Sequence, residues 1–539
     1  MISLRYTLLI ATFGWHTTVF AQAVSLPDPA QVGPRAMPES IAPVQAPFEM
    51  AELARPDFGE TQGDGRRERV RFAADASGSA LVTSTLQAAI DRLSAAGGGT
   101  LVVPEGEWLT GRILLKSGVN LHVPRGATLR FSGRIEDYLP VVFARYEGLE
   151  VMSLGGLIYA HNADRIAITG RGTLVGPDEG PVREARSGLS DKVVDANLPV
   201  EQRVMDGLHG RHYLRPQFLL LMNCRNVLIE GVTLRNGPMW NIVPTYCDRV
   251  IVRGVTVHSN GVVNGDGVNI ESSRNVLVEY CDMNTGDDCY AMKSGRGADG
   301  LRAARPVENV VLRRNHASGG FGGVTFGSET AGGIRNVYVH DCVFENVRHA
   351  AYFKTRRPRG GGGERITVER VRFTANNHGL FFDMIGSPLY VGELGERLPR
   401  RALTRLTPFY RQITLRDIQG ECSEGDALKI KGIPESPASN LLLERIDIIA
   451  PGLPNLADVT DVTVRDCRFH AEQPTLTLLD AAGVRFDNCL FDVAGAGVGV
   501  DLAGEQSHGV VFRAVEPAVD RASINAHDGA QKSAVSITE

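Results

Sequence analysis

A short strand-like segment recurs along this chain, and that recurrence constrains the fold more than any other feature. Each copy alternates apolar with polar residues, as a strand with one buried face does; examples are NVLIEGV from Asn226, NVLVEYC from Asn275 and NVVLRRN from Asn309. Between Val227 and Val310 the copies are separated by steps of 23, 26 and 34 residues, with no long helical pattern between them. A strand that recurs at this interval predicts a solenoid, because one coil cannot bury its apolar face without a neighbour.

We therefore expect an all-β chain that forms a right-handed, single-stranded parallel β-helix, with successive coils stacked about 4.8 Å apart. A leucine-rich solenoid is the alternative, but its L-x-x-L-x-L period is missing from the sequence. Cys224 and Cys247 hold the same phase in neighbouring copies. This placement favours buried, stacked thiols, although the sequence assigns no disulfide pairing.

The N-terminal end of a solenoid needs a cap, because an open end exposes unpaired strand edges. We expect a short capping helix in the segment from Ser84 to Leu93. Leu86, Ile90 and Leu93 make one apolar helical face there, and Ser84 and Gln87 have the spacing of a capping box.

The two ends of the chain differ from the repeat region. Residues 1–23 have the apolar centre and the small-residue cleavage site of a secretory signal peptide. Residues 24–47 are rich in Pro and Ala and are expected to form a disordered leader. The β-helix catalytic domain is expected over residues 48–515, and residues 516–539 lose the repeat and are expected to be a polar tail. The signal peptide predicts a secreted or periplasmic protein.

Charge and hydropathy argue against two classes of partner. The formal net charge of −5 at pH 7 gives no global basic excess for nucleic-acid binding. No apolar run reaches the roughly 18 residues that a membrane-spanning helix needs. We expect a monomer with neither a nucleic-acid nor a membrane partner after signal cleavage.

Six residues fall at similar distances after their strand markers on five successive coils. Their neighbours are rich in Gly (NGDGV, TGDDC and GGFGGV), which lets the chain turn tightly and a ligand approach closely. They are expected to line one side of the solenoid as a groove. The six are Trp240, Asp266, Asp287, Asp288, Phe321 and Lys354.

Three of these residues are carboxylates on two adjacent coils, and their mutual repulsion should raise at least one pKa. A protonated acid beside an ionised base is the combination that glycoside hydrolysis requires. Two other interpretations stay open from the residues alone. Adjacent Asp residues also bind Ca²⁺, and an Asp in a Gly-rich turn often only shapes that turn.

The segment NGDGVNIESSRNVLVEYCDMNTGDDCYAMKSGR (264–296) resembles the centre of glycoside hydrolase family 28, the polygalacturonases. The resemblance extends over roughly residues 48–515, through blocks such as GGGTLVVPEGEWLTG, RPQFLLLMNC and FKTRRPRGGGGE. It implies inverting hydrolysis of an acidic plant cell-wall polysaccharide of the pectin type, without cofactor or metal. Asp287 would be the general acid, and Asp266 and Asp288 would hold and activate the attacking water. The carboxyl separation expected for inversion is roughly 6.5–9.5 Å, or slightly less.

The same resemblance implies substrate-binding residues and also shows two departures from the family pattern. Asn264 would shape the −1 subsite, Lys354 would pair with a substrate carboxylate, and Trp240 lies in the same groove. Phe321 stands where the family has the histidine of G-H-G, and Tyr352 stands where it has the arginine of R-I-K. Both are therefore expected at the substrate, in a −1 subsite not built for plain galacturonate in the usual way. The expected enzyme is exo-acting on pectin oligomers, or directed at rhamnogalacturonan or another decorated pectin.

Two further segments bear on specificity. Arg356, Arg357 and Arg359 follow Lys354 and supply replacement positive charge, unless they form only a solvated basic loop. The long insert over residues 176–210 favours exo action if it walls off one end of the groove. Two other functions remain as alternatives: a catalytically inactive β-helix that binds polysaccharide, and a Ca²⁺-dependent pectate lyase.

Overall fold

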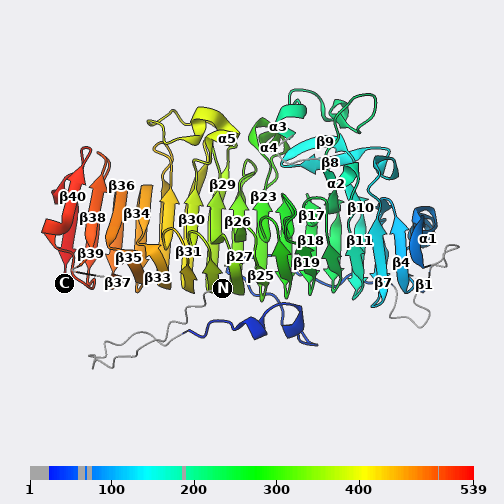
Figure 1. Cartoon of the computed structure of the whole chain (residues 1–539), viewed down its shortest axis with the longest axis horizontal. Coiled ribbons are helices and arrows are strands. Elements are labelled where there is room, and N and C mark those ends of the chain that lie inside the picture. The colour runs from blue at the N-terminus through cyan, green and yellow to red at the C-terminus, as the bar shows by residue number, and fades with distance from the viewer. Residues whose placement is uncertain (1–23, 59–66, 70–75, 185–189, 494, 496) are drawn as a thin grey trace, which may run out of the picture.

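The structure is a computed structural model that describes residues 24–539 apart from 59–66, 70–75, 185–189, 494 and 496. The predicted signal peptide, residues 1–23, lies outside the described residues. The chain winds into a long parallel β-helix with its strands stacked side by side (Figure 1). This confirms the fold class predicted from the repeat.

The recurring segments form a first column of strands, and their markers are direct neighbours. Val227 pairs with Val250, Val250 with Val276, and Val276 with Val310, all in parallel register. The column is built from β3 (Gly99–Val102), β6 (Val119–Val123), β11 (Asp164–Gly170), β15 (Arg225–Glu230), β18 (Asp248–Arg253), β21 (Arg274–Glu279), β24 (Val307–Arg313), β27 (Ile334–Val347), β29 (Gly362–Ala375), β31 (Phe409–Cys422), β33 (Ala438–Gly452), β34 (Asn455–Arg465), β36 (Thr475–Asp487), β39 (Val510–Arg513) and β41 (Val535–Thr538).

A second column follows the first in each coil, and several long strands, such as β27, run through both columns. The separate strands of this column are β2 (Ser77–Leu81), β4 (Gly106–Thr110), β7 (Ala127–Phe131), β12 (Thr173–Val175), β16 (Thr233–Arg235), β19 (Thr256–Ser259), β22 (Asp282–Thr285), β25 (His316–Ser318), β35 (Arg468–Gln473) and β37 (Leu490–Val493).

A third column completes each coil and carries the candidate site. Inward side chains from all three columns, mostly Val, Ile, Leu and Phe, fill one continuous core. The third column consists of β5 (Ile113–Leu114), β10 (Gly156–His161), β14 (Gln217–Met222), β17 (Ile242–Thr245), β20 (Val268–Glu271), β23 (Tyr290–Lys293), β26 (Gly322–Gly327), β28 (His349–Lys354), β30 (Leu380–Asp383), β32 (Leu428–Lys431), β38 (Gly499–Ala503) and β40 (Ile524–His527), with parts of β34 and β36.

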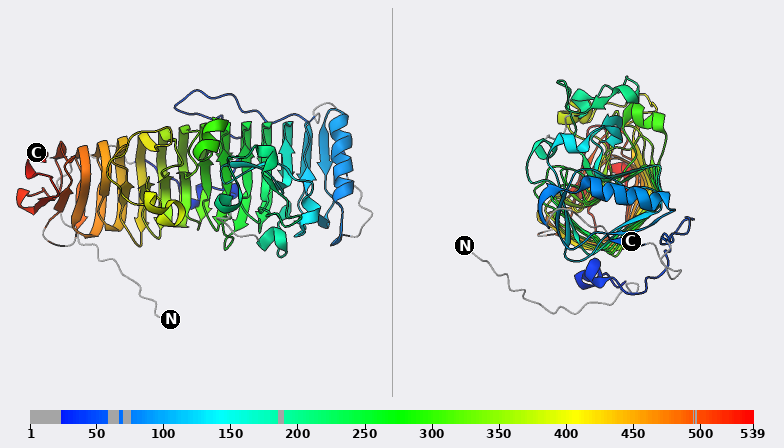
Figure 2. Two further views of the ribbon diagram at one scale, coloured as in Figure 1. Left: turned by 90° about the horizontal axis from the view of Figure 1, so that it is seen from above. Right: turned by 90° about the vertical axis from the view of Figure 1, so that its right-hand side faces the viewer.

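Helix α1 (Thr83–Ala95) lies across the N-terminal end of the solenoid, as Figure 2 shows end-on. Leu86, Ile90 and Leu93 are buried, which confirms the predicted apolar face. The predicted capping box is wrong, because the cap position is Val82 and no side chain bonds there. The Gln87 amide instead exchanges two hydrogen bonds with the Leu114 backbone, at 2.9 and 3.0 Å, and so ties the helix to β5.

Residues 24–47 are not a disordered leader, so that prediction is wrong. They form two short 3₁₀ turns, Pro29–Gln31 and Pro34–Ala36, and the Gly33 amide donates to the Arg314 carbonyl at 2.8 Å. The segment continues along the outside of the first column, where it is drawn in dark blue in Figure 1.

We call residues 42–58 the N-terminal strap. Its apolar side chains, among them Phe48 and Met50, pack on outward residues of the first column such as Leu228, Ile251 and Leu277. The strands of this column from β11 to β24 are therefore apolar on both faces, and the strap covers the outer one. Covering this apolar stripe is the physical reason why a Pro- and Ala-rich segment is ordered.

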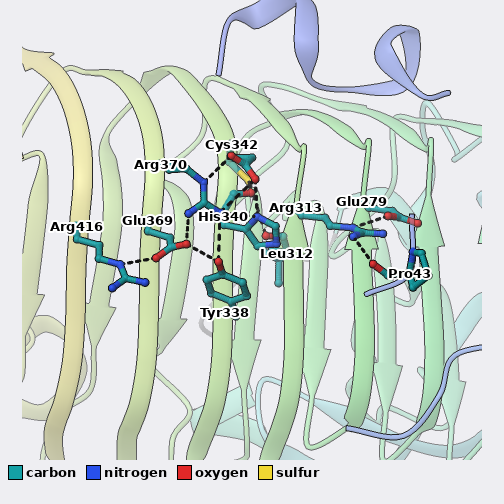
Figure 3. A network of polar contacts seen from close by, with 11 residues as sticks. Pro43, Glu279, Leu312, Arg313, Tyr338, His340, Cys342, Glu369, Arg370 and Arg416 are labelled. Atoms are coloured by element: carbon teal, nitrogen blue, oxygen red, sulfur yellow. Dashed lines mark hydrogen bonds and ion pairs between the residues drawn. The ribbon is translucent and has the colours of Figure 1, made fainter. Parts of the chain in front are cut away.

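A polar network beside the strap fixes its start (Figure 3). Arg313 donates to the carbonyls of Ala42 at 2.6 Å and Pro43 at 3.1 Å. It also donates to the fully buried Glu279 carboxylate at 2.8 Å, and Arg253 donates to the other oxygen of that carboxylate at 2.6 Å. Glu279 therefore binds the guanidinium groups of Arg253 and Arg313, and Arg313 in turn binds the start of the strap.

We expect Glu279→Ala to lower the thermal unfolding midpoint clearly, with a loss of about 3–5 kcal/mol in unfolding free energy. Removing one member of a buried ion pair leaves its partners without compensation. The control is Glu364→Ala, whose partner Arg411 is half exposed, and which should cost less than about 1 kcal/mol. Equal losses in the two variants would contradict this role for Glu279.

The C-terminal residues 516–539 also differ from the predicted polar tail. β40 pairs with β38, and β41 pairs with β39, so the segment adds to the solenoid. Ile524 and Val535 are buried on the core side. The strands INAH and VSIT are short, and each carries few apolar residues, which hides the repeat in the sequence.

All eight cysteines are buried free thiols. Cys224 and Cys247 interact with each other on neighbouring coils, as predicted for an interior ladder. Among the described residues, no helix is long and apolar enough to cross a membrane.

Candidate active site

The turns between the second and third columns bring three aspartates together. Asp266 precedes β20, and Asp287 and Asp288 precede β23 on the next coil. One carboxylate oxygen from each of the three lies within 4.8 Å of the others. The tight stacking of these turns needs Gly, because a Cβ on Gly286 would lie 2.2 Å from the Val262 carbonyl oxygen. The sequence predicted this cluster from the coil phase alone.

Asp288 is the most strongly hydrogen-bonded of the three. Thr325 Oγ1 donates to its Oδ1 at 2.9 Å, and Lys354 Nζ donates to its Oδ2 at 2.7 Å. Burial alone would raise its pKa, but the ammonium groups of Lys354 and Lys293 hold the pKa of Asp288 below its ordinary value. Asp288 is therefore ionised at neutral and mildly acidic pH.

Asp287 has the opposite protonation behaviour. Burial and the negative charge of Asp288 raise the pKa of Asp287 to about 6. Its Oδ1 accepts a hydrogen bond from the Asp288 backbone N–H at 2.9 Å. No ammonium group of the described residues lies within ion-pair distance of it, and it is the least buried of the three carboxylates. Two adjacent aspartates thus differ in charge at the same pH, which is the pattern of an acid and a base.

Asp266 is 1% exposed, and its Oδ1 has no hydrogen-bond partner. Burial and the charge of Asp287 raise the pKa of Asp266 well above its ordinary value, while Lys293 acts against them. Lys293 Nζ lies 3.5 Å from Asp266 Oδ2. This ion pair opposes the effect of burial and favours the ionised form of Asp266.

Lys293 is the residue of this site that the sequence analysis missed. Its ammonium group lies 3.5–3.7 Å from the carboxylates of Asp266, Asp288 and Glu329. Burial opposes its charge, but these carboxylates hold the pKa of Lys293 above its ordinary value. The signal was the alternation of YAMK in β23: Tyr290 and Met292 point into the core, so position 293 points to the site.

Two ammonium groups at the cluster also bear on cation binding. Three carboxylates within 4.8 Å of one another are a set that could hold a metal ion. Lys354 and Lys293 already supply positive charge to the carboxylates of Asp288 and Asp266. An added divalent cation would face their repulsion at close range, so the donor set fits Ca²⁺ poorly.

Two of the predicted substrate-binding residues are engaged with the protein itself. Trp240 is 3% exposed, and its ring faces the Lys293 ammonium at 4.7 Å. Asn264 Oδ1 accepts a hydrogen bond from Arg215 Nη2 at 2.9 Å. Trp240 therefore packs against Lys293, and Asn264, two residues before Asp266, binds Arg215.

The two residues that depart from the family pattern differ in their surroundings. Phe321 is 41% exposed, with the Arg348 guanidinium 5.0 Å above its ring. Tyr352 is largely covered and stacks on Phe381, with ring centroids 5.1 Å apart, beneath the Lys354 ammonium. Phe321 therefore offers an open apolar face, and Tyr352 forms part of the floor of the site.

The three arginines after Lys354 differ in their ion pairs. Arg357 forms a buried bidentate pair with Glu435, at 2.6 and 2.8 Å, and Arg359 pairs with Glu329. Arg356 has no carboxylate within ion-pair distance among the described residues, and its Nε is buried without a hydrogen-bond partner. Burial and the nearby Arg359 charge lower the pKa of Arg356. Of the three, Arg356 is the guanidinium available to a ligand.

Insertions leave the coil at two points: residues 132–155 and 176–210 lie between the second and third columns, and the insertions after β23 and β30 lie between the third and first columns. The insert over 176–210 contributes α2 (Pro181–Glu184), α3 (Ser190–Val193) and β13 (Val204–Met205), which pairs with β9 (Leu149–Ser153) beside β8 (Val142–Tyr146). Helices α4 (Gly297–Ala303) and α5 (Pro388–Val391) stand on the same side of the solenoid, above the strands in Figure 1.

Comparison with known proteins places this site in context. The family model for glycosyl hydrolases family 28 matches residues 210–468. The structure of a hyperthermoactive exopolygalacturonase from Thermotoga maritima superimposes with a TM-score of 0.67 at 30% identity, covering 82% of this chain and 94% of that one.

Two curated relatives also have names of galacturonan-degrading enzymes. A probable polygalacturonase of Vitis vinifera is 28% identical over 391 residues, which are 70% of this chain and 73% of the relative. An exo-poly-alpha-D-galacturonosidase of Dickeya chrysanthemi is 27% identical over 322 residues, 55% of this chain and about half, 53%, of the relative.

Proposed function

The chain belongs to glycosyl hydrolases family 28 and is a glycosidase, and we propose that it hydrolyses galacturonate linkages of pectin with Asp287, Asp288 and Asp266. The observation that carries the proposal is that the adjacent Asp287 and Asp288 have pKa values shifted in opposite directions, so that below about pH 6 the first is protonated and the second ionised. One can give a proton, and the other can accept one, within a single cluster.

In this mechanism Asp287 protonates the glycosidic oxygen, and Asp288 and Asp266 orient and deprotonate the attacking water. The carboxylate oxygens lie within 4.8 Å, which is closer than the roughly 6.5–9.5 Å typical of inverting pairs. Direct attack by a carboxylate is nonetheless disfavoured, because Asp266 and Asp288 are almost completely buried. A water held by both is the better nucleophile, and its attack from the opposite face inverts the anomeric carbon.

The positive groups beside the cluster support an acidic substrate. Lys354, Arg356 and Lys431 lie at the C-terminal ends of β28 and β32 or just beyond, on one edge of the third column. Lys431 has no ion pair to a described residue, and its ammonium lies 5.8 Å from the Phe381 ring. These cations suit the carboxylates of galacturonate units. Exo action is favoured by the exo-acting relatives and by the insertions beside the site.

Product analysis tests the proposed function. Polygalacturonate, rhamnogalacturonan and oligogalacturonides are incubated with enzyme, and products are followed by reducing-sugar release, chromatography and proton NMR of the new anomeric centre. We expect monogalacturonate from chain ends, with inverted configuration. A folded enzyme that releases no sugar from any pectic substrate would contradict the proposal, and an unsaturated, ultraviolet-absorbing product would identify a lyase instead.

We expect kcat/KM to fall about tenfold per pH unit above pH 6. The acid Asp287 must be protonated, and its pKa is raised to about 6, so activity is present below that pH and lost above it. On the acid side Asp288 stays ionised, because its pKa is lowered. A pH–rate profile on oligogalacturonides measures this, and an alkaline limb that begins above pH 8 would contradict it.

Arg356→Ala should raise KM for oligogalacturonides by about 10–100-fold with little change in kcat, because a charge-assisted hydrogen bond to a substrate carboxylate is lost. Arg356→Lys should recover part of the affinity. Arg411→Ala is the control, since Arg411 lies on β31 with half of its side chain exposed and bonds Glu364. An unchanged KM in Arg356→Ala would show that the carboxylates bind elsewhere.

We also propose that the mature enzyme acts as a monomer outside the cytoplasm, in the periplasm or the medium. The location rests on the signal peptide predicted over residues 1–23. Cell fractionation, and the mass of the N-terminal peptide of the exported protein, test the location and the cleavage site.

A further inference from the structure

Three histidines on the outside of the solenoid each lie between two carboxylates. His316 is in β25, His470 is in β35, and His527 is the last residue of β40. In all three, both ring nitrogens lie 2.8–3.3 Å from a carboxylate oxygen. We call these three groups the acid–imidazole bridges, because each connects its own coil to at least one neighbouring coil.

The bridge at His316 spans three successive coils. Its Nδ1 lies 2.8 Å from Asp282 Oδ1 on β22 of the preceding coil, and its Nε2 lies 2.8 Å from Glu345 Oε2 on β27 of the following coil. Gly33 packs on the same coil, because a Cβ on Gly33 would lie 3.5 Å from His316 Cβ. The His316 bridge therefore joins three coils beneath an ordered turn of the N-terminal segment.

The bridge at His470 repeats this arrangement farther along the second column. Its Nε2 lies 3.3 Å from Asp447 Oδ1 on β33, and its Nδ1 lies 2.9 Å from Asp492 Oδ2 on β37. Strand β35 pairs with both of these strands, so this bridge also spans three coils.

The bridge at His527 lies in the third column, near the C-terminal end of the solenoid. Its Nε2 lies 3.1 Å from Asp501 Oδ1 on β38, the strand that pairs with β40. Its Nδ1 lies 2.9 Å from Oδ2 of the next residue, Asp528. This bridge therefore joins two coils.

Only a doubly protonated imidazole fits this geometry fully. A carboxylate accepts hydrogen bonds, whereas a neutral imidazole has one N–H donor and one nitrogen lone pair. In the neutral form, that lone pair would face a carboxylate oxygen at hydrogen-bond distance with no proton between them. The imidazolium form donates to both carboxylates, and such charge-assisted hydrogen bonds are the stronger kind.

The carboxylates outweigh the other groups that act on these histidines. Burial opposes the charge of His316, but the hydrogen bonds to its two carboxylates raise its pKa. The hydrogen bonds to Asp447 and Asp492 raise the pKa of His470, and those to Asp528 and Asp501 raise the pKa of His527. The other charged groups beside the bridges are Arg35 of the N-terminal turn, Arg314 and Arg372 around His316, Arg468 and Glu472 on either side of His470, and Lys532 after His527.

We propose that the acid–imidazole bridges make the stacking of the coils pH-dependent: they form in mildly acidic solution and are lost in alkaline solution. Because the pKa of each histidine is raised on folding, the stabilisation is complete below the ordinary histidine pKa of about 6.5 and disappears as the pH rises through the raised values. The bridges are therefore formed in the same pH range in which Asp287, with a pKa of about 6, is protonated. The inference concerns the scaffold and does not depend on the proposed reaction.

Other buried groups also change the stability with pH, so a difference between two proteins has to be measured. Burial lowers the pKa of His349 to about 3 and that of His378 to about 4, which reduces stability as the pH falls below about 6.5. Burial raises the pKa of Glu271 to about 7, which reduces stability as the pH rises toward that value. These contributions cancel between two proteins that differ only at the bridges.

The test compares the thermal unfolding midpoints of wild type and the triple variant His316→Gln, His470→Gln, His527→Gln at pH 5.5, 7 and 9. Gln stays polar but never becomes a cation. We expect the midpoint difference between the two proteins to be larger at pH 5.5 than at pH 9 by about 2–5 °C, because each partly exposed bridge contributes little alone. His258→Gln is the control: this exposed histidine of β19 has no carboxylate partner among the described residues, so its midpoint difference should not change with pH.

Histidine NMR tests the protonation directly, and it uses wild type, so it remains decisive if the triple variant does not fold. With ¹³C-labelled histidine, the rings of His316, His470 and His527, assigned from the single Gln variants, should titrate above pH 6.5. Asp492→Asn should move the titration of His470 to lower pH. A midpoint difference that is equal at pH 5.5 and pH 9, or ordinary pKa values for the three rings, would overturn the inference.

Discussion

Replacing Asp287 by Asn lowers kcat on oligogalacturonides by roughly 10²–10⁴-fold and changes KM by only a fewfold. The range is that of general acid catalysis. Asn keeps the shape of the side chain and its acceptor oxygen for the Asp288 N–H, so the turn should keep its structure. The measurement is steady-state kinetics at pH 5, where wild-type Asp287 is mostly protonated.

A second substrate makes this test specific for the acid. An aryl galacturonide with a good leaving group needs little protonation, so Asp287→Asn should cost far less on it than on oligomers. The alkaline limb of the pH–rate profile should also disappear in the variant. If Asp287→Asn lost the same activity on both substrates and kept the alkaline limb of the pH–rate profile, another group would be the proton donor.

Replacing Lys293 by Met should reduce kcat/KM at pH 5 by about 10²-fold. Lys293 touches no reacting atom in the proposed mechanism; it acts through its positive charge, which favours the ionised forms of Asp266 and Asp288. Without it, the pKa of these carboxylates rises and the base is protonated over the working range. The acid limb of the pH–rate profile should therefore move to higher pH, which a purely structural role would not cause.

The same substitution should also destabilise the protein, by roughly 3–5 kcal/mol, because several buried carboxylates lose their shared counter-ion. Lys293→Arg keeps the charge and should restore part of the activity. Lys429→Met is the control, since Lys429 pairs with the partly exposed Asp426 on the same strand column. A folded Lys293→Met enzyme with an unshifted acid limb would exclude the positioning role.

The parts of this fold that follow from near-neighbour stacking could be predicted from the sequence. The markers Val227, Val250, Val276 and Val310 are register partners because apolar residues of successive coils must lie over one another. The same stacking brought Asp266 beside Asp287 and Asp288, so counting residues from the markers was enough to predict the carboxylate cluster.

The features that were missed depend on contacts between distant parts of the chain. The strap is ordered by an apolar stripe that exists only after several coils have stacked. The pairing of Arg357 with Glu435 spans 78 residues and crosses the insertion around α5. No local pattern distinguishes it from the free Arg356, so the sequence could not say which arginine remains for a ligand.

The stacking of coils has a consequence for how such enzymes can diversify. The catalytic aspartates occupy only two neighbouring turns, and each coil contacts mainly the coils next to it. Under the proposed function, adding or deleting a whole coil beyond β30 would lengthen or shorten the strand face beside the aspartates while leaving the aspartates in place. Duplication of one coil would therefore change the preferred substrate length in steps of one strand spacing. The residues that carry out the reaction would not need to change.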